Sequence, residues 1–231
     1  MHLTDNFQYK IIFSRRRTLC IMVSPDKGVV VKAPSRTPVE TIRKFVMQKS
    51  NWISRTLNRF NTLIKIDKPE GYSDGDILLL FGRPHKLKLY SADNYSVRLG
   101  NNETIEVFYD HDNNPLIIRT ILENWFKYIA NNKFKIKFSE ILNRVKDYGF
   151  TPSGFAVKKM KKRWGSCSAK GKIAISYDLI RLDDKYSEYV MIHELCHLKQ
   201  HNHGNGFYSL LNEVYPDWKS QRTELKKYIR Q

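Results

Sequence analysis

The hydrophobic pattern of the chain changes its period at a run of six polar or turn-forming residues, 110–115. Before this run, apolar and polar residues alternate in short segments separated by Gly, Pro, Asn and Asp, which is typical of β-strands and turns. One stretch, residues 37–64, has apolar residues at helical spacing instead. We therefore predict a β-rich N-terminal region, 1–112, with helices near 37–64. Its strands are expected at 7–13, 18–24, 28–33, 77–82, 85–91, 95–99 and 104–109.

After the run, the spacing of apolar residues predicts a long helix over 116–147, ended by Gly149 and Pro152. Short strands at 153–159 and 172–177 follow, and then helices from about residue 184 onward with a break at 202–205. The pattern predicts a second region over 113–231 and an α+β fold for the whole chain. No internal repeat is apparent in the sequence.

Composition excludes several classes of protein. Of the 231 residues, 41% are hydrophobic and 13% aromatic, which is enough to form a core and excludes disorder over most of the chain. Neither a run of ~18 apolar residues nor an apolar N-terminal segment is present, so we expect a soluble, cytoplasmic protein without a membrane span. Cys20, Cys167 and Cys196 lie far apart and predict reduced thiols rather than disulfides or a thiolate metal site.

The chain is strongly basic, with 40 Lys and Arg against 23 Asp and Glu and a net charge of +17. Such a field attracts polyanions, so nonspecific nucleic-acid binding through a basic surface is one hypothesis. A general bias toward basic residues is the alternative, and the charge alone does not choose between them. One basic cluster on the last predicted helix is expected to face solvent opposite an apolar stripe: Arg222, Lys226, Lys227 and Arg230.

Four of the seven histidines lie between residues 193 and 203, and two of them form the pattern His-Glu-x-x-His. In a helix, His193 and His197 lie one turn apart on the same face, so both imidazoles can bind one metal ion. Glu194 projects about 100° from His193, which keeps it out of the ligand set but lets it reach a water molecule at the ion. This predicts one zinc ion, or another divalent ion such as cobalt, nickel or manganese, with Glu194 as general acid/base. A buried pair of histidine and carboxylate without an ion is the alternative.

A third ligand is expected, because catalytic zinc is commonly held by three protein side chains. His203 is preferred, since Asn202 and Gly204 are residue types that allow a left-handed turn, after which the chain can fold back over the helix. His201 lies ~12 Å from His193 along a continued helix, too far for ligands of one ion, and is expected to be exposed. Glu213 on the following helix is the fallback ligand.

A second candidate cluster holds five cations in residues 158–163, followed by Trp164 and Ser166. We interpret this segment as a β-hairpin with 172–177, in which Trp164 is anchored in the core and the cations lie beside the metal. Arg163 or a neighbouring lysine would then bind a substrate carboxylate or phosphate, and Arg163, Trp164 and Ser166 are candidate substrate-binding residues. Plain surface solubility is the alternative. Cys167 has no neighbouring base in the sequence and is not expected to be a nucleophile.

Several of these segments together resemble the YgjP-like family of metallopeptidases, which is related to the SprT-like and WLM zincins. The resemblance rests on 163–168 (Arg-Trp-Gly-Ser-Cys-Ser), 189–197, Asn202-His203, Phe207, 216–218 (Pro-Asp-Trp), 72–76 and 80–83. It implies a minimal zincin domain in the second region, with zinc ligands His193, His197 and His203 and with Glu194 as general acid/base. It leaves the substrate open, because some members are described as nucleotide pyrophosphatases that act on UTP.

Three functions are compatible with these residues. The first is peptide-bond hydrolysis by metal-activated water, with Glu194 moving the proton and the substrate extended along the edge of the 172–177 strand. The second is metal-dependent hydrolysis of nucleoside triphosphates such as UTP, with the cations of 158–163 holding phosphate oxygens, although no Gly-x-x-x-x-Gly-Lys-Ser/Thr loop is present. The third is a protease recruited to DNA by its basic surface.

Overall fold

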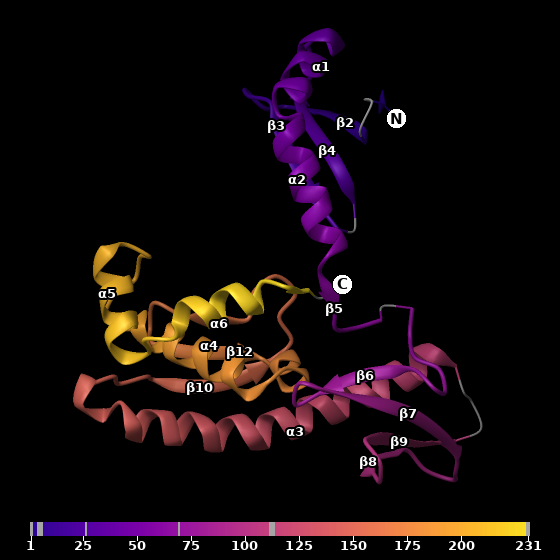
Figure 1. Ribbon diagram of the computed structural model, residues 1–231, viewed down its shortest axis with the longest axis vertical. Coiled ribbons are helices and arrows are strands. Elements are labelled where there is room, and N and C mark those ends of the chain that lie inside the picture. Colours follow the sequence, from indigo (N-terminus) through magenta and orange to yellow (C-terminus); the bar gives the residue numbers. More distant parts are fainter. Residues whose placement is uncertain (1, 4–6, 26, 69, 111–113, 230–231) are drawn as a thin grey trace. The chain divides into compact units, whose positions relative to one another are not determined.

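The computed structural model (Figure 1) describes residues 2–3, 7–25, 27–68, 70–110 and 114–229. The chain divides into two compact units, Met1–Ile64 and Lys65–Gln231. The predicted boundary at 112/113 and half of the predicted linker lie outside the described residues. The strands between 77 and 109 share a hydrophobic core with the long helix that follows them.

The unit Met1–Ile64 is a four-stranded sheet that packs against two helices. Its strands are β1 (His2–Leu3), β2 (Gln8–Ser14), β3 (Cys20–Ser24) and β4 (Gly28–Pro34), in the order β1-β2-β4-β3. The helices are α1 (Val39–Gln48) and α2 (Ser50–Asn61), which lie in the stretch 37–64 where the sequence predicts helices. Ile42, Val46 and Ile53 of the helices are fully buried and belong to one hydrophobic cluster with Val29 and Val31, alternate residues of β4 that face the same side of the sheet.

The unit Lys65–Gln231 begins with a second four-stranded sheet that has the same strand order. Its strands are β6 (Ile77–Leu80), β7 (Arg83–Ser91), β8 (Ser96–Gly100) and β9 (Thr104–Tyr109), in the order β6-β7-β9-β8. In both sheets the three neighbouring pairs are antiparallel, parallel and antiparallel in turn. The two sheets therefore repeat one topology, although the sequence shows no repeat.

The long helix α3 (Pro115–Arg144) connects this sheet to the C-terminal half of the unit. Asn114 caps the helix by accepting a hydrogen bond from the Leu116 N–H, and Pro115 occupies the first turn. The buried residues of α3 recur at every third or fourth position: Ile118, Leu122, Phe126, Ala130, Phe134, Phe138 and Ile141. The helix contacts β8 and β9 and also β10 (Gly154–Lys158) and α4 (Asp184–Cys196). Both halves of the unit therefore pack against α3 (Figure 1).

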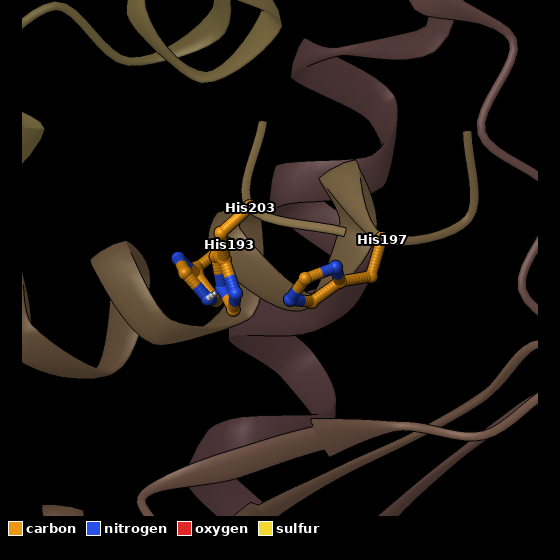
Figure 2. Close-up of side chains that lie close together, drawn as sticks. All are labelled: His193, His197 and His203. Carbon is orange, nitrogen blue, oxygen red and sulfur yellow. Dashed lines mark hydrogen bonds between the residues drawn. The ribbon is translucent and has the colours of Figure 1, made fainter. Parts of the chain in front are cut away.

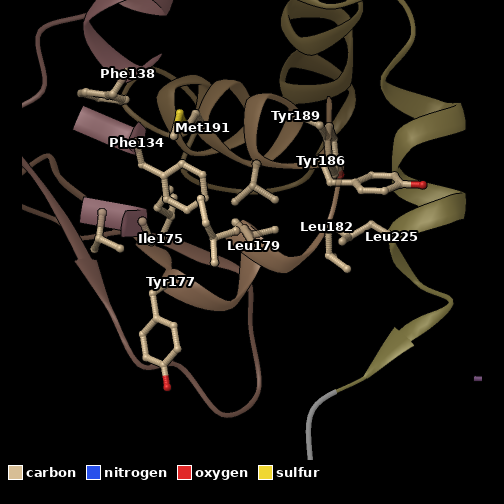
Figure 3. Close-up of a cluster of buried hydrophobic side chains, with 14 of the residues drawn as sticks. Phe134, Phe138, Ile175, Tyr177, Leu179, Leu182, Tyr186, Tyr189, Met191 and Leu225 are labelled. Carbon is tan, nitrogen blue, oxygen red and sulfur yellow. The ribbon is translucent and has the colours of Figure 1, made fainter. Parts of the chain in front are cut away.

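The C-terminal half of the unit holds a three-stranded sheet and three helices. The strands are β10 (Gly154–Lys158), β11 (Gly165–Cys167) and β12 (Lys172–Ser176), in the order β10-β12-β11. The helices are α4 (Asp184–Cys196), α5 (Asn205–Val214) and α6 (Trp218–Leu225). Side chains of α3, of the short helix η2 (Tyr177–Arg181) and of α4 belong to one buried core, for example Phe134, Leu179 and Met191 (Figure 3). The remaining elements are β5 (Ile64–Lys65), η1 (Lys146–Tyr148), η2 (Tyr177–Arg181) and β13 (Tyr228–Ile229). The predicted α+β fold is confirmed.

A buried arginine ties the start of this unit to its core. Arg181 is 1% exposed, and its guanidinium donates hydrogen bonds to the Ile66 carbonyl (2.8 Å) and the Tyr72 hydroxyl (3.2 Å). The guanidinium carbon lies 4.0 Å from the centre of the Phe126 ring, and the Asp178 carboxylate lies 3.8 Å from Nε. Because a buried cation needs such partners, Arg181 fixes the chain segment before β6 against α3.

Candidate metal centre

The helix α4 carries the His-Glu-x-x-His pattern at its C-terminal end. Asp183 caps α4 by accepting a hydrogen bond from the Lys185 N–H. Most of the helix is buried, and its last turns bring His193 and His197 to the same side. Their ring centres are 5.0 Å apart (Figure 2). The fold therefore holds both imidazoles at the end of a buried, well-packed helix.

His203 returns to these two imidazoles after α4 ends. Its Nε2 lies 3.0 Å from Nε2 of His193, and one ligand nitrogen from each of the three histidines lies within 4.8 Å of the others (Figure 2). The chain reverses through a short turn, in which the Gly204 N–H donates to the Asn202 carbonyl. Gly204 has a φ of −87°, so the turn does not use the left-handed conformation that we expected there.

The other two candidates for a third ligand lie elsewhere. His201 is exposed on the wall of the cleft and is not part of the histidine cluster, in agreement with its expected exposure. Glu213 lies beside Tyr148, where its charge and a hydrogen bond contribute, after burial, to a raised pKa of the phenol. The structure thus brings together His193, His197 and His203, and it places neither His201 nor Glu213 with them.

A single phenylalanine packs against all three imidazoles. Phe207 of α5 is fully buried, and its ring centre lies 4.9 Å from that of His193, 4.6 Å from that of His197 and 4.7 Å from that of His203. His197 is oriented further by its Nδ1, which lies 3.0 Å from the Gln200 carbonyl. These contacts restrict the rings before any ligand binds, so the nitrogens are preorganised.

The three histidines fit a divalent ion with nitrogen ligands. Two nitrogens at 2.0–2.1 Å from one ion in tetrahedral geometry are about 3.4 Å apart, close to the 3.0 Å between His193 and His203. Burial and then the charges of the neighbouring imidazoles lower the pKa of His193 to about 3. Burial and then the charges of His197 and Arg222 also lower the pKa of His203. Both rings are therefore neutral near pH 7, which is the form that binds metals.

Glu194 lies next to the histidine cluster with its carboxyl group buried. Its side chain contacts β11 where Gly165 leaves room, and it accepts a hydrogen bond from the Cys167 N–H. Burial raises the pKa of Glu194 to about 7, although the positive charge of Arg163 and the Cys167 hydrogen bond oppose this rise. A carboxyl group with such a pKa can accept and release a proton near neutral pH.

A cleft with a volume of about 680 Å³ opens over these residues. The predicted substrate-binding residues Arg163, Trp164 and Ser166 all line it, and Trp164 is partly buried against the core as predicted. The lysines of 158–162 do not line the cleft; Lys159, for example, forms an ion pair with Glu123 on α3 at 2.6 Å. The expected cluster of cations beside the metal is therefore reduced to Arg163.

The strand beside the cleft is not the one that we predicted. β12, which corresponds to the predicted 172–177 strand, is the middle strand and pairs with β10 on one side and β11 on the other. β11 is an edge strand, and its residues Gly165, Ser166 and Cys167 line the cleft. Sequence reasoning missed this because β11 has only three residues, too few for a periodic pattern.

Comparison with known proteins decides the family. The model of the family described as YgjP-like, metallopeptidase domain, matches residues 17–228. The chain belongs to the YgjP-like metallopeptidase family. It is accordingly a metal-dependent hydrolase of the peptidase class. No helix of the described part of the chain is long and apolar enough to cross a bilayer.

Two solved structures align with part of this YgjP-like chain. One is the metallopeptidase zymogen of Pyrococcus abyssi abylysin, with 24% identity, a TM-score of 0.35, and coverage of 40% of this chain and 98% of that chain. The other is the metallopeptidase zymogen of Methanocaldococcus jannaschii jannalysin, with 26% identity, a TM-score of 0.34, and coverage of 40% and 91%. A comparison with curated protein sequences gives no match.

The structure also places residues of α6 at the cleft of this YgjP-like chain. Arg222, Leu225 and Lys226 line it, as Arg163 does. We had expected the basic cluster of the last helix to face solvent; Arg230 of that cluster lies outside the described residues. The one signal in the sequence is the position of Arg222 one turn after Trp218, and that signal does not show which element the helix faces.

Proposed function

We propose that the chain hydrolyses peptide bonds with one divalent metal ion, zinc by its ligand type, held by His193, His197 and His203. Imidazole nitrogen in a three-histidine set suits zinc, and cobalt, nickel or manganese can replace it. The observation that carries the proposal is the convergence of three imidazoles within 4.8 Å beside a buried carboxyl group. A bound ion would polarise the peptide carbonyl and make water more acidic at that point.

The chain's own residues supply the proton transfers. With its pKa raised to about 7, Glu194 accepts a proton from the attacking water and gives it to the nitrogen of the departing amine. The Cys167 N–H holds the carboxylate in place while it does so. Gly165 lets the side chain of Glu194 lie against β11, so that its carboxyl group stays in a poorly solvated position at the wall of the cleft.

We expect the substrate to bind as an extended strand along β11. The Ser168 N–H donates a hydrogen bond to the Lys172 carbonyl, and the Ser176 N–H donates one to the Trp164 carbonyl. The even-numbered residues of the β11 segment therefore bond to the β12 segment. The backbone groups of Gly165 and Cys167 therefore point away from β12, toward the open edge. An added peptide strand can pair with the groups of this edge that Glu194 does not use.

Metal analysis and a peptide screen test this proposal together. We expect about one equivalent of zinc in the purified chain and cleavage of unstructured peptides or denatured proteins. Glu194→Gln should retain the metal and lose at least about 100-fold in turnover, because the proton acceptor is removed while the ligands remain. Full metal content with no cleavage beyond the Glu194→Gln background would contradict peptide hydrolysis.

The positive lining of the cleft favours one second candidate, metal-dependent hydrolysis of nucleoside triphosphates such as UTP. Arg163, Arg222 and Lys226 supply cations for phosphate oxygens. Release of pyrophosphate from UTP, abolished by His193→Ala, would support this function. No turnover of any nucleotide by metal-loaded protein would remove it.

The unit Met1–Ile64 carries a charge density that fits recruitment to DNA or another nucleic acid. Twelve Lys and Arg against three Asp and Glu give it a net charge of +9 of the total +17, in 64 residues. Binding of this kind weakens steeply as the salt concentration rises from low to physiological values. An affinity for duplex DNA that does not change with salt, or no affinity at low salt, would exclude this partner.

A further inference from the structure

The cleft contains a cation that has no counterion among the described residues. Arg222 is half-buried at the cleft, and its guanidinium makes no ion pair or hydrogen bond with any described side chain. Its neighbours are two aromatic rings: the guanidinium carbon lies 5.7 Å from the centre of the Tyr208 ring and 5.9 Å from that of Trp218. A half-buried charge without an ionic partner is suited to a ligand that supplies one.

The two rings form a rigid support for this charge. Tyr208 and Trp218 are stacked, with ring centres 5.1 Å apart and an angle of 18° between their planes. Contacts with aromatic rings leave the N–H groups of the guanidinium free to donate. Because the side chain is already held, less conformational entropy is lost when an anion binds to it.

The position of Arg222 relates the charge to the reacting centre. Tyr208 lies beside Arg222 and also beside His203, with ring centres 6.2 Å apart in the latter pair. An anion bound to Arg222 would therefore lie within a few residues of the bond that is cleaved.

The charges that line the cleft are mainly positive. Arg163, Arg222 and Lys226 line it, and Glu194 is the one acidic residue among its described lining residues. A peptide with an acidic side chain would compensate this charge, whereas a basic peptide would be repelled.

We propose that Arg222, supported by Lys226, is a specificity residue that binds the carboxylate of a Glu or Asp side chain in the peptide substrate, near the scissile bond. A guanidinium binds a carboxylate through two parallel N–H···O hydrogen bonds, which a neutral amide cannot reproduce with equal strength. The proposal rests on the proposed peptidase function and adds to it the chemical class of the preferred substrate.

Matched peptides test the proposal in the metal-loaded chain of residues 1–231. Peptides that are cleaved are resynthesised with Glu, Gln or Lys at each position next to the scissile bond. We expect kcat/KM for Glu to exceed that for Gln by about tenfold or more at one position, as for a hydrogen bond to a charged group. Arg222→Met should reduce this ratio to about one, Arg222→Lys should restore part of it, and Arg222→Glu should shift the preference toward Lys.

Lys219 offers a matched control on the same helix. Its Nζ lies 5.7 Å from the centre of the Trp218 ring, but Lys219 does not line the cleft. Lys219→Met therefore removes a cation from the same aromatic ring and should leave the ratio of Glu to Gln unchanged. Thermal unfolding of each variant shows whether it is folded, and Arg222→Lys provides a folded comparison if Arg222→Met is not.

A binding measurement separates this inference from the peptidase function. Fluorescence anisotropy with labelled Glu and Gln peptides and the Glu194→Gln protein reports selectivity without turnover. Selective binding without cleavage by the wild type contradicts the peptidase function and leaves the carboxylate site in place. Cleavage of Glu and Gln peptides at equal rates contradicts the carboxylate site but not the peptidase function. Equal binding of both peptides, or binding of neither, also contradicts the carboxylate site. Dependence of UTP binding on Arg222, with no peptide selectivity, would replace the carboxylate by a phosphate and overturn the proposal.

Discussion

Gly165 of β11 and Glu194 of α4 are in contact so close that no side chain fits between them. A Cβ atom on Gly165 would lie 2.6 Å from Oε1 of Glu194 and 2.7 Å from Cγ1 of Val190. Atoms this close must move apart, and Val190 belongs to the buried face of α4. The absence of a Cβ at this position is what allows the edge strand and the proposed general base to share one wall of the cleft.

Gly165→Ala should therefore displace Glu194 and reduce kcat by tenfold or more, roughly the effect of a misplaced catalytic group. The metal content should stay near one equivalent, because the three histidines do not contact Gly165 among the interactions described above. Gly154→Ala is the control: it lies in β10 of the same sheet, and its added Cβ would meet only Lys172 Cγ at 3.9 Å. Equal losses of activity in both variants would argue against this role of Gly165.

His201 and His203 lie two positions apart in the sequence, but replacing them should have very different effects on metal affinity. His203→Ala removes one of three converging nitrogens and should weaken zinc affinity by about 100-fold or more. His201→Ala should change the affinity by less than about threefold, because His201 is not part of the cluster. Competition with a chromophoric chelator measures both affinities. Similar affinities in the two variants would show that His203 is not a ligand.

Phe207 should couple metal affinity to stability. Phe207→Ala leaves a cavity under all three imidazoles and should reduce the free energy of unfolding by about 3–5 kcal/mol. Because the rings lose their common support, zinc affinity should fall by about 10–100-fold, as for other residues that orient ligands. Phe207→Leu should show smaller changes of both quantities. Chemical denaturation with and without zinc measures them, and unchanged zinc affinity in a folded Phe207→Ala protein would contradict the coupling.

The metal-free protein should become less stable in acid because of His193. Its pKa is about 3 in the fold and 6.5 in the unfolded chain, so the unfolded state binds more protons between these values. The contribution of His193 to the free energy of unfolding is therefore present above pH 6.5 and is lost as the pH falls toward 3. Glu194, with a pKa raised from 4.5 to about 7, has the opposite effect between pH 4.5 and 7.

Urea unfolding of chelator-treated protein at several pH values separates the two groups. The wild type should show a shallow dependence between pH 4.5 and 6.5, where the contributions of His193 and Glu194 oppose each other. Glu194→Gln removes the second contribution and should lose stability steadily below pH 6.5. Identical pH profiles for the two proteins would contradict this assignment.

The three cysteines should react with iodoacetamide in a fixed order. Cys196 is buried, and burial raises the pKa of its thiol to about 12, so it should react only after unfolding. Cys167 is partly exposed, but burial and then the charge of Glu194 raise its pKa, so it should react more slowly than Cys20. Mass spectrometry of labelled peptides gives the order. Rapid labelling of Cys196 in the native protein would contradict its burial.

Hydrophobic period and capping residues were sufficient to predict most elements of the fold. The predicted helix over 116–147 corresponds to α3, which begins at Pro115, and α1 and α2 lie in the stretch 37–64 where helices are predicted. These features depend on neighbouring residues, which the sequence displays directly. The meeting of His193, His197 and His203 is of the same kind, since helical spacing and a nearby turn bring them together.

Features that depend on the packing of distant elements could not be predicted. The position of Phe207 under three imidazoles depends on how α5 crosses α4, and the place of Arg222 depends on the direction of α6. The role of β11 as the edge strand, in place of the predicted 172–177 strand, depends on the strand order of the sheet. Periodicity identifies the buried face of an element but not the element that covers it.

The three imidazoles all come from eleven consecutive residues, 193–203. A segment this short can close around an ion at little entropic cost even when the rest of the chain is unfolded. The unfolded chain should therefore keep some affinity for the ion. Since only the difference in affinity between the two states stabilises the native one, zinc should protect this protein against heat by less than its dissociation constant from the folded state suggests.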